Sequence, residues 1–212
     1  MRPFIRRQKE ARTELNPQLR ASLTWWIDTL NHGATPREIP RTLHITTYIT
    51  YSDGEGSDAG VGVAVWGGSL GKPLAAFLTV PREVRLLWTA QRNFSPAGQR
   101  DIFEIEAVGP LVILATWPGL LTGSYWIHFI DNTAAQASLV KGSSSVMSGD
   151  AIVGITWGMV AHQRIMPWFD RVDSKSNPVD GLSRGRTTGP WQEVRRGRLP
   201  GELLRSLRRN AF

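Results

Sequence analysis

The sequence predicts an α/β fold in which a mixed five-stranded sheet carries helices on both faces. Three strand-like segments come first and are separated only by short turns, which is typical of antiparallel hairpins. Two further strand-like segments each follow a helical pattern, which is typical of parallel strands joined by helical crossovers. The predicted order of elements is therefore β-β-β-α-β-α-α-β-α.

The first three strands are predicted from composition and turn residues. The segment LHITTYITYSD (43–53) is rich in Ile, Thr and Tyr, which favour strands. Glycines and small polar residues at 54–60 form a turn, after which VGVAVWGG (61–68) pairs back antiparallel with the first strand. PLAAFLTVP (73–81) is the third strand, and residues 82–100 are predicted to be irregular.

The second half of the chain alternates helices and strands. A helix is predicted at 101–117, although Gly109 and Pro110 must kink it or delay its start. The segment SYWIHFID (124–131) is apolar on both faces, as in a central parallel strand. The remaining predicted elements are helices at 133–142 and 149–164, a strand at 165–172 and a last helix beginning within SNPVDGLSRG (176–185).

Upstream of the sheet, residues 17–30 are predicted to be helical, with an apolar face that includes Leu19, Leu23, Trp26, Ile27 and Leu30. A loop rich in Pro, Gly and Thr follows and marks a boundary. We therefore predict an N-terminal basic arm with a helical connecting segment, a main domain, and a basic C-terminal tail. Their ranges are 1–42, 43–188 and 189–212.

The net charge of +7 is concentrated at the two ends of the chain. Residues 1–20 and residues 193–212 each hold six basic and two acidic residues, whereas the body between them is nearly neutral. Basic arms suit a polyanionic partner, and solvated tails are the competing interpretation. For 193–212 both interpretations of the basic charge stay open. The leucines of this segment could also form one apolar stripe on a helix.

Composition excludes several classes of site. The chain has no cysteine, so a disulfide scaffold, a thiolate metal site and a cysteine nucleophile are excluded. Any metal must be bound by oxygen or imidazole. The sequence contains no apolar run long enough to span a bilayer and no secretory signal, so we expect an intracellular protein without membrane partners.

Four carboxylates are the candidate functional residues: Asp53, Glu106, Asp131 and Asp180. Each lies where a predicted strand ends or a predicted helix begins. Gathered carboxylates repel one another, so a fold that brings them together usually holds a divalent cation. Each also has a structural alternative: a turn at Asp53, a helix first turn at Glu106, a helix cap at Asp131, and at Asp180 the third position of a helix that has Asn177 as its cap and Pro178 as its first residue.

Four segments together resemble the ribonuclease H domain, and more closely the version in reverse transcriptases of DIRS-type (tyrosine-recombinase) retrotransposons. These segments are YSDGEGSDAGVGVAVW, IFEIEAVGPLVILATW, FIDNTAAQASLVKG and WFDRVDSKSNPVDGLSRG. The upstream LTWWIDTLNHGATPREIP is similar to the segment that joins polymerase to ribonuclease H in those elements. The resemblance implies a retroelement-derived enzyme, and a polymerase domain in cis or trans as a partner.

The resemblance also implies the chemistry. Asp53, Glu106, Asp131 and Asp180 would bind two Mg²⁺ ions, with Mn²⁺ as a substitute, and hydrolyse the RNA strand of an RNA:DNA hybrid. The family pattern places an apolar residue four before the acid and a small residue after it, which selects Glu106 over Glu104. The catalytic His that many relatives carry before the last Asp is absent, since residues 171–179 contain none.

Four further residues are predicted to contact nucleic acid: Asn132, Arg171, Lys175 and Arg184. Three of the four histidines, His44, His128 and His162, are interpreted as packed or solvated residues. Two other functions stay open. One is a non-catalytic ribonuclease H-like module that binds nucleic acid or a polymerase, and the other is a nuclease of the same fold that acts on DNA.

Overall fold

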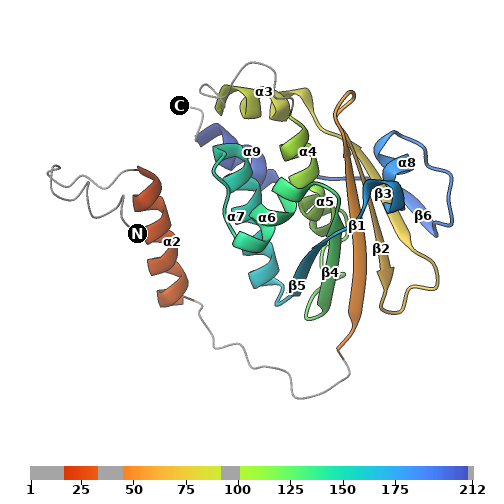
Figure 1. Cartoon of the computed structure of the whole chain (residues 1–212). Helices are drawn as coiled ribbons and strands as arrows, with labels where there is room; N and C mark the ends of the chain where they lie inside the picture. Colours follow the sequence, from red (N-terminus) through yellow and green to blue (C-terminus); the bar gives the residue numbers. More distant parts are fainter. Residues whose placement is uncertain (1–16, 33–44, 92–100, 210–212) are drawn as a thin grey trace, which may run out of the picture. The chain divides into compact units, whose positions relative to one another are not determined.

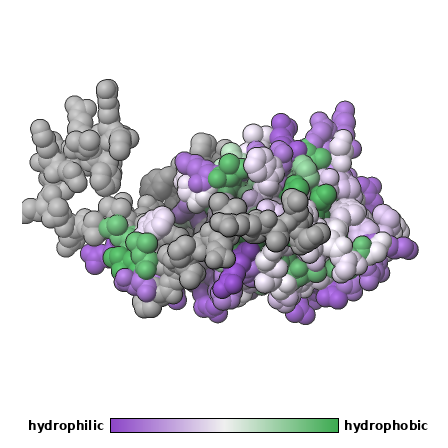
Figure 2. Space-filling view, turned by 90° about the horizontal axis from the view of Figure 1, so that it is seen from below, coloured by the Kyte–Doolittle hydropathy of each residue, from purple (hydrophilic) through white to green (hydrophobic). Residues whose placement is uncertain are grey.

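A computed structural model describes residues 17–32, 45–91 and 101–209, and divides the chain into two units, Met1–Leu43 and His44–Phe212. In the first unit, α2 (Pro17–His32) is the helix predicted at 17–30. Leu23, Trp26, Ile27 and Leu30 on this helix are exposed, and Figure 2 shows hydrophobic side chains gathered there. Residues 1–16, most of the loop predicted at 31–42, and His44 lie outside the described residues.

The second unit is built on a mixed sheet of six strands in the order β5-β4-β1-β2-β3-β6. The strands are β1 (Thr47–Glu55), β2 (Gly60–Gly67), β3 (Leu74–Thr79), β4 (Tyr125–Ile130), β5 (Met166–Arg171) and β6 (Glu193–Arg196). β1, β2 and β3 pair antiparallel, whereas β4, β5 and β6 join by parallel pairing. The predicted fold class is confirmed, and the arrangement is broadly ribonuclease H-like. The predicted strand number was one too low, because β6 was not anticipated.

Most helices lie on one face of the sheet (Figure 1). This layer consists of α4 (Ile102–Ala107), α5 (Gly109–Thr116), α6 (Thr133–Lys141) and α7 (Met147–His162), joined by α3 (Arg82–Gln91) and α9 (Gly201–Arg209). The short α8 (Asp180–Ser183) lies on the other face and follows a single turn of 3₁₀ helix, η1 (Ser174–Ser176). None of the described helices is both long enough and apolar enough to cross a membrane.

Three helical predictions need correction. Residues 82–91, predicted to be irregular, form α3, whose Val84 and Trp88 are fully buried. The predicted helix at 101–117 is two helices that meet at Val108, because Pro110 has no N–H and is accommodated in the first turn of α5. The last helix begins at Asp180, so Asn177 is not its cap and Pro178 is not its first residue.

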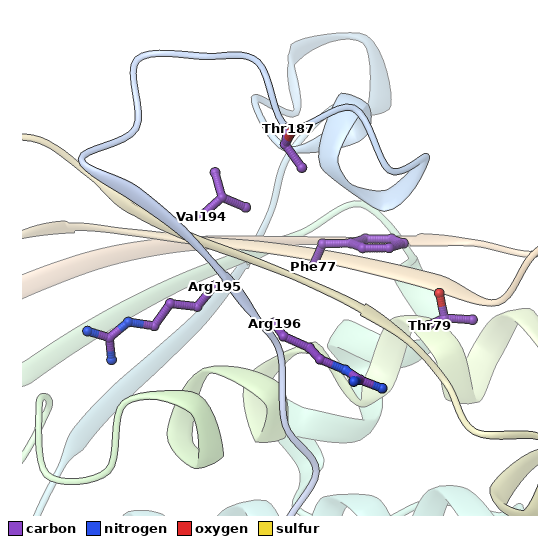
Figure 3. A pocket seen from close by; sticks show the side chains of 6 residues that line it. All are labelled: Phe77, Thr79, Thr187, Val194, Arg195 and Arg196. Carbon is purple, nitrogen blue, oxygen red and sulfur yellow. The ribbon is translucent and has the colours of Figure 1, made fainter.

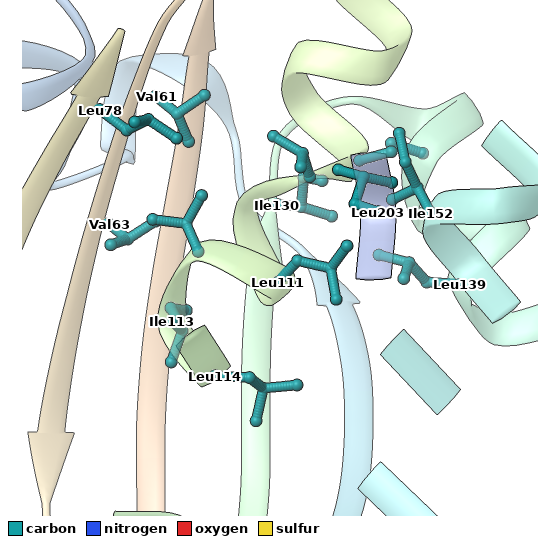
Figure 4. Packing of buried hydrophobic residues seen from close by; sticks show 14 of the residues in the cluster. Val61, Val63, Leu78, Leu111, Ile113, Leu114, Ile130, Leu139, Ile152 and Leu203 are labelled. Atoms are coloured by element: carbon teal, nitrogen blue, oxygen red, sulfur yellow. The ribbon is translucent and has the colours of Figure 1, made fainter. Parts of the chain in front are cut away.

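The core lies between the sheet and the main helical layer (Figure 4). Val61 and Val63 on β2 and Leu78 on β3 face Leu111 and Ile113 of α5. These side chains are buried, and the same cluster continues to α6, α7 and α9. On the opposite face a smaller cluster joins α8 to β2 and β3 through Ala64, Ala75, Val179 and Leu182.

The C-terminal residues fold onto the second unit. β6 pairs in parallel with β3, and Leu203 and Leu207 of α9 are fully buried in the main core. The leucine stripe that the sequence allowed for this segment is found on a helix, α9. Its arginines at 205, 208 and 209 are exposed.

The other edge of the sheet is β5, whose backbone N–H groups alternate in direction. The N–H groups of Met166 and Val172 bond to carbonyls on the β4 side, so the backbone of Pro167, Phe169 and Arg171 is directed away from β4. Pro167 has no N–H, and the N–H of Arg171 donates to its neighbour Asp170 Oδ1 at 2.7 Å. Among these three residues, only Phe169 has a backbone N–H that no neighbouring side chain engages.

Candidate metal centre

Asp53 lies near the end of β1, directly opposite Gly62 of β2. Its side chain is buried and is held by two donors from the chain around α8. The Ser183 hydroxyl donates to Oδ2, and Asn177 Nδ2 donates to Oδ1 at 3.4 Å and to the carbonyl of Ser52 at 2.9 Å. The carboxylate therefore has a fixed orientation, which a simple turn residue would not need.

Glu106 comes from α4, which packs against β1. Gly54 makes room for it, because a Cβ at Gly54 would lie 3.0 Å from the Glu106 side-chain carboxyl carbon. Glu104, two residues earlier, turns elsewhere and accepts a hydrogen bond of 2.6 Å from Ser148 Oγ on α7. Between the two glutamates, Glu106 is thus the one beside β1.

Asp131 follows β4 directly and is half-buried. Asn132 is the cap of α6, since its Oδ1 accepts from the N–H of Ala135 at 3.0 Å. Asp131 is therefore not needed as a helix cap, and its carboxylate points to the same place as Asp53 and Glu106.

Carboxylate oxygens of Asp53, Glu106 and Asp131 lie within 4.8 Å of one another. Burial, followed by the charges of Asp131 and Asp53, raises the pKa of Glu106 to about 10. Burial also raises the pKa of Asp53 to about 6, against the hydrogen bond from Ser183 that lowers it. In the absence of a cation, this arrangement is electrostatically unfavourable for the charged forms.

The cluster fits a hard cation. Glu106 is only 5% exposed, and its Oε2 atom is buried with no hydrogen-bond partner among the described residues. Buried acceptors are nearly always satisfied, so a carboxylate beside two others that keeps an unsatisfied oxygen is what a metal ligand presents before binding. All of the donors are oxygens, the ligand type of Mg²⁺, Mn²⁺ and Ca²⁺. These acidic residues can bind a metal ion.

Asp180 lies outside this three-carboxylate group. It is the first residue of α8, its side chain is 41% exposed, and it forms ion pairs with Arg184 at 3.0 Å and Arg186 at 3.4 Å. Its charge still contributes to raising the pKa of Asp53, so it lies close to the cluster. The structure thus brings three of the four predicted carboxylates together and holds the fourth beside them in arginine pairs.

The predicted nucleic-acid contacts lie around the same end of the sheet. Lys175 on η1 is exposed and lines an open hollow with Asn177 and Asp180. Arg171 ends β5 and is exposed, whereas Arg184 is tied to Asp180. Asn132 is half-buried, with its carbonyl oxygen used by the cap of α6.

Sequence reasoning missed the supports of Asp53, namely Ser183 and Asn177. The signal that was available is the pair Gly60 and Gly62, since glycines inside a strand often mark close approach of another backbone. A Cβ on Gly62 would lie 2.5 Å from the Ser183 nitrogen, and a Cβ on Gly60 would collide with the Ser183 carbonyl. The two glycines allow α8 to lie directly on β2 and to deliver Ser183 to Asp53.

The histidine predictions agree with the structure where it describes them. His128 is fully buried and bonded to Thr50 Oγ1 at 2.7 Å and Ser52 Oγ at 3.1 Å. Burial lowers the pKa of His128 to about 3, so the ring is neutral and structural. His162 is exposed at the end of α7.

No family model, curated protein or solved structure matches this chain. The class of the site therefore rests on the fold and on the geometry of its carboxylates.

Replacing Ser183 with Ala is expected to raise the pKa of Asp53 above its value of about 6 in metal-free protein, because the Ser183 hydroxyl stabilises the ionised carboxylate. Carbon-13 NMR titration of the Asp53 carboxyl in chelator measures this pKa directly. The control is Ser174→Ala, at an exposed serine of the hollow that Lys175 also lines, and it should leave the pKa of Asp53 unchanged. A lower or equal pKa in Ser183→Ala would show that the hydroxyl does not support the charge.

Proposed function

We propose that this chain is a divalent-metal-dependent ribonuclease H that hydrolyses the RNA strand of RNA:DNA hybrids. One observation carries the proposal: Asp53, Glu106 and Asp131 converge from three separate elements to within 4.8 Å, with the Glu106 Oε2 atom buried and unsatisfied. The ribonuclease H-like order of strands supports it. β1 and β4 are adjacent and parallel, so their C-terminal residues lie side by side at one end of the sheet.

In this proposal, Asp53 and Asp131 would provide most of the ligands for two metal ions. Glu106 would complete the ligands of one ion and Asp180 those of the other. Bound Mg²⁺ would supply Lewis-acid activation of water and neutralise the charge that develops on the phosphate. Ser183 and Asn177 hold Asp53 in one orientation, so its carboxylate stays beside Glu106 and Asp131. The preorganised carboxylates need little rearrangement when the cation binds, which is how a site lowers its reorganisation cost.

Asp180 has a conditional part in this arrangement. Its carboxylate oxygens are engaged by Arg184 and Arg186 on an exposed surface, where such pairs contribute only about 0.2–1 kcal/mol each. A divalent ion can therefore compete with these guanidinium groups for the carboxylate. Arginines released in this way remain near the site, where they are available to a phosphate.

The test is cleavage of labelled substrates by the purified chain. RNA:DNA hybrid, double-stranded RNA and double-stranded DNA are offered with Mg²⁺ or Mn²⁺, alongside Asp131→Asn as the inactive control. We expect endonucleolytic cutting of the RNA strand of the hybrid that requires metal and is lost in Asp131→Asn. Binding of the hybrid without metal-dependent cutting would support a non-catalytic module, and cutting of duplex DNA would support a DNA nuclease.

A further inference from the structure

The β6 strand places an arginine on the same face of the sheet as Asp53. The cross-strand partners run from Asp53 on β1 to Gly62 on β2, then to Phe77 on β3 and Arg196 on β6. Side chains of directly paired residues lie on the same face. Three strand spacings separate the ends of this row, or about 14 Å. No side chain rises from Gly62, because the backbone of α8 lies directly on it, so the two ends of the row flank α8.

An open groove lies where this row reaches the edge of the sheet (Figure 3). Arg195 and Arg196 extend from β6 in opposite directions, with Arg196 directed toward Thr79 at the end of β3. Its lining combines apolar, hydroxyl and guanidinium groups: Phe77, Thr79, Thr187, Val194, Arg195 and Arg196.

The arginines near the site differ in whether an acid already engages them. Arg184 and Arg186 pair with Asp180, and Arg195 pairs with Glu193 at 2.7 Å. Arg196 is exposed, and no ion pair found among the described residues includes it. Of the four arginines at 184, 186, 195 and 196, Arg196 is therefore the one that an incoming anion meets without displacing a carboxylate.

We propose that this β6 groove binds the phosphate backbone of the nucleic acid whose reacting phosphate lies at the acidic cluster, with Arg196 as its principal contact. This inference rests on the proposed function. Carboxylates at Asp53, Glu106 and Asp131 repel phosphate, so affinity for a polyanion has to come from cations elsewhere on the same surface. The fork of donors on a guanidinium matches phosphate oxygens, and the hydroxyls of Thr79 and Thr187 add further donors.

The separation suits a duplex. With an axial rise of about 3.4 Å per nucleotide, 14 Å corresponds to roughly four nucleotide steps. A duplex that occupies both places therefore extends about four steps beyond the reacting phosphate. A contact of this kind positions the substrate and does not take part in the chemical step.

Binding of a 20-base-pair fluorescent hybrid tests the proposal, with Asp131→Asn as the non-cleaving background in Mg²⁺. Adding Arg196→Gln should weaken binding roughly five-fold at about 0.1 M salt and reduce the salt slope of log Kd by about one. Arg205→Gln, which removes an exposed arginine of α9 in the helical layer outside the groove, is the control and should change Kd less than two-fold. Arg196→Lys should recover most of the affinity, since it keeps the charge.

In the wild-type background, Arg196→Gln should raise KM and leave kcat unchanged, which a merely structural role would not produce. The proposal is overturned if Arg196→Gln and Arg205→Gln have the same Kd and the same salt slope. Failure of the proposed function has a different signature, because the wild type then cuts no hybrid whatever Arg196 does. Weaker binding by Arg196→Gln alongside absent cutting would retain the backbone contact and discard the ribonuclease activity.

Discussion

Glu106→Gln is expected to stabilise the metal-free protein while abolishing its activity and its stabilisation by divalent metal. The pKa of Glu106 is raised from 4.5 to about 10, so the folded state binds a proton that the unfolded state releases. When folding raises the pKa of a carboxyl group, the free energy of unfolding falls as the pH rises from the pKa in the unfolded state toward the pKa in the folded state. Gln carries no such proton, so the variant avoids this loss.

The expected gain at pH 7 in chelator is up to about 3 kcal/mol in the free energy of unfolding, and it should vanish near pH 4. Urea unfolding at several pH values measures this difference. With Mg²⁺ added, the wild type should gain stability and the variant should not, because one carboxylate of the cluster is lost. Cleavage of the hybrid should fall by roughly a thousand-fold.

Glu104→Gln is the matched control, two residues away on the same helix. Glu104 is also buried but bonds to Ser148 and lies outside the three-carboxylate group. The variant should keep the stabilisation by Mg²⁺ and the cleavage activity. Loss of the metal response in Glu104→Gln but not in Glu106→Gln would show that Glu104, and not Glu106, is the metal ligand on α4.

Gly60→Ala is expected to displace α8 and to lower both stability and activity. A Cβ at this position collides with the backbone carbonyl of Ser183, which cannot rotate away as a side chain would. Overpacking against a fixed group costs about 1–3 kcal/mol, and we expect the upper end of this range. Because Ser183 then moves away from Asp53, hybrid cleavage should fall more than ten-fold even at temperatures where the protein stays folded.

The control for this prediction is Gly154→Ala in α7, where an added Cβ meets nothing within 4 Å. Alanine there should stabilise the helix by about 0.5–1 kcal/mol and leave cleavage unchanged. Thermal unfolding and initial cleavage rates measure both variants. Equal stability and activity in Gly60→Ala and the wild type would show that α8 tolerates a shift away from β2.

The strands of the antiparallel hairpins and β4 were predictable because their local patterns agree with their place in the fold. The segment rich in Ile, Thr and Tyr forms β1, and the apolar run at 124–131 contains β4. The main helical layer covers only one face of β4, however, and Tyr125 on the opposite face is 42% exposed. Apolar character of a strand therefore did not by itself prove burial on both sides.

β6 and α3 were missed for a different physical reason. The residues Glu193–Arg196 include three charged side chains, and they are a strand only because β3 offers them hydrogen bonds. In α3 the core-facing Val84, Leu87 and Trp88 have helical spacing, but the exposed Leu86 beside them obscures this apolar face in the sequence. Tertiary pairing, which no local pattern records, determined β6.

The candidate site was predictable in its acids and not in its supports. Strand ends at Asp53 and Asp131 follow from the sequence, and adjacent parallel strands bring such ends together. The helix-cap pattern at Asn177 concealed its actual contact with Asp53, which lies 124 residues earlier in the chain. A contact over that separation depends on the fold of the whole sheet.

The β5 edge has a consequence for how copies of this chain behave at high concentration. Unprotected edge strands recruit strands from other molecules, and proline and charged side chains at an edge oppose this. Because Pro167 offers no donor and Asp170 occupies that of Arg171, an added strand would find a ladder with two of its three donors withheld. Strand-to-strand aggregation through β5 is thereby discouraged, even though the indole of Trp168 beside it is 66% exposed.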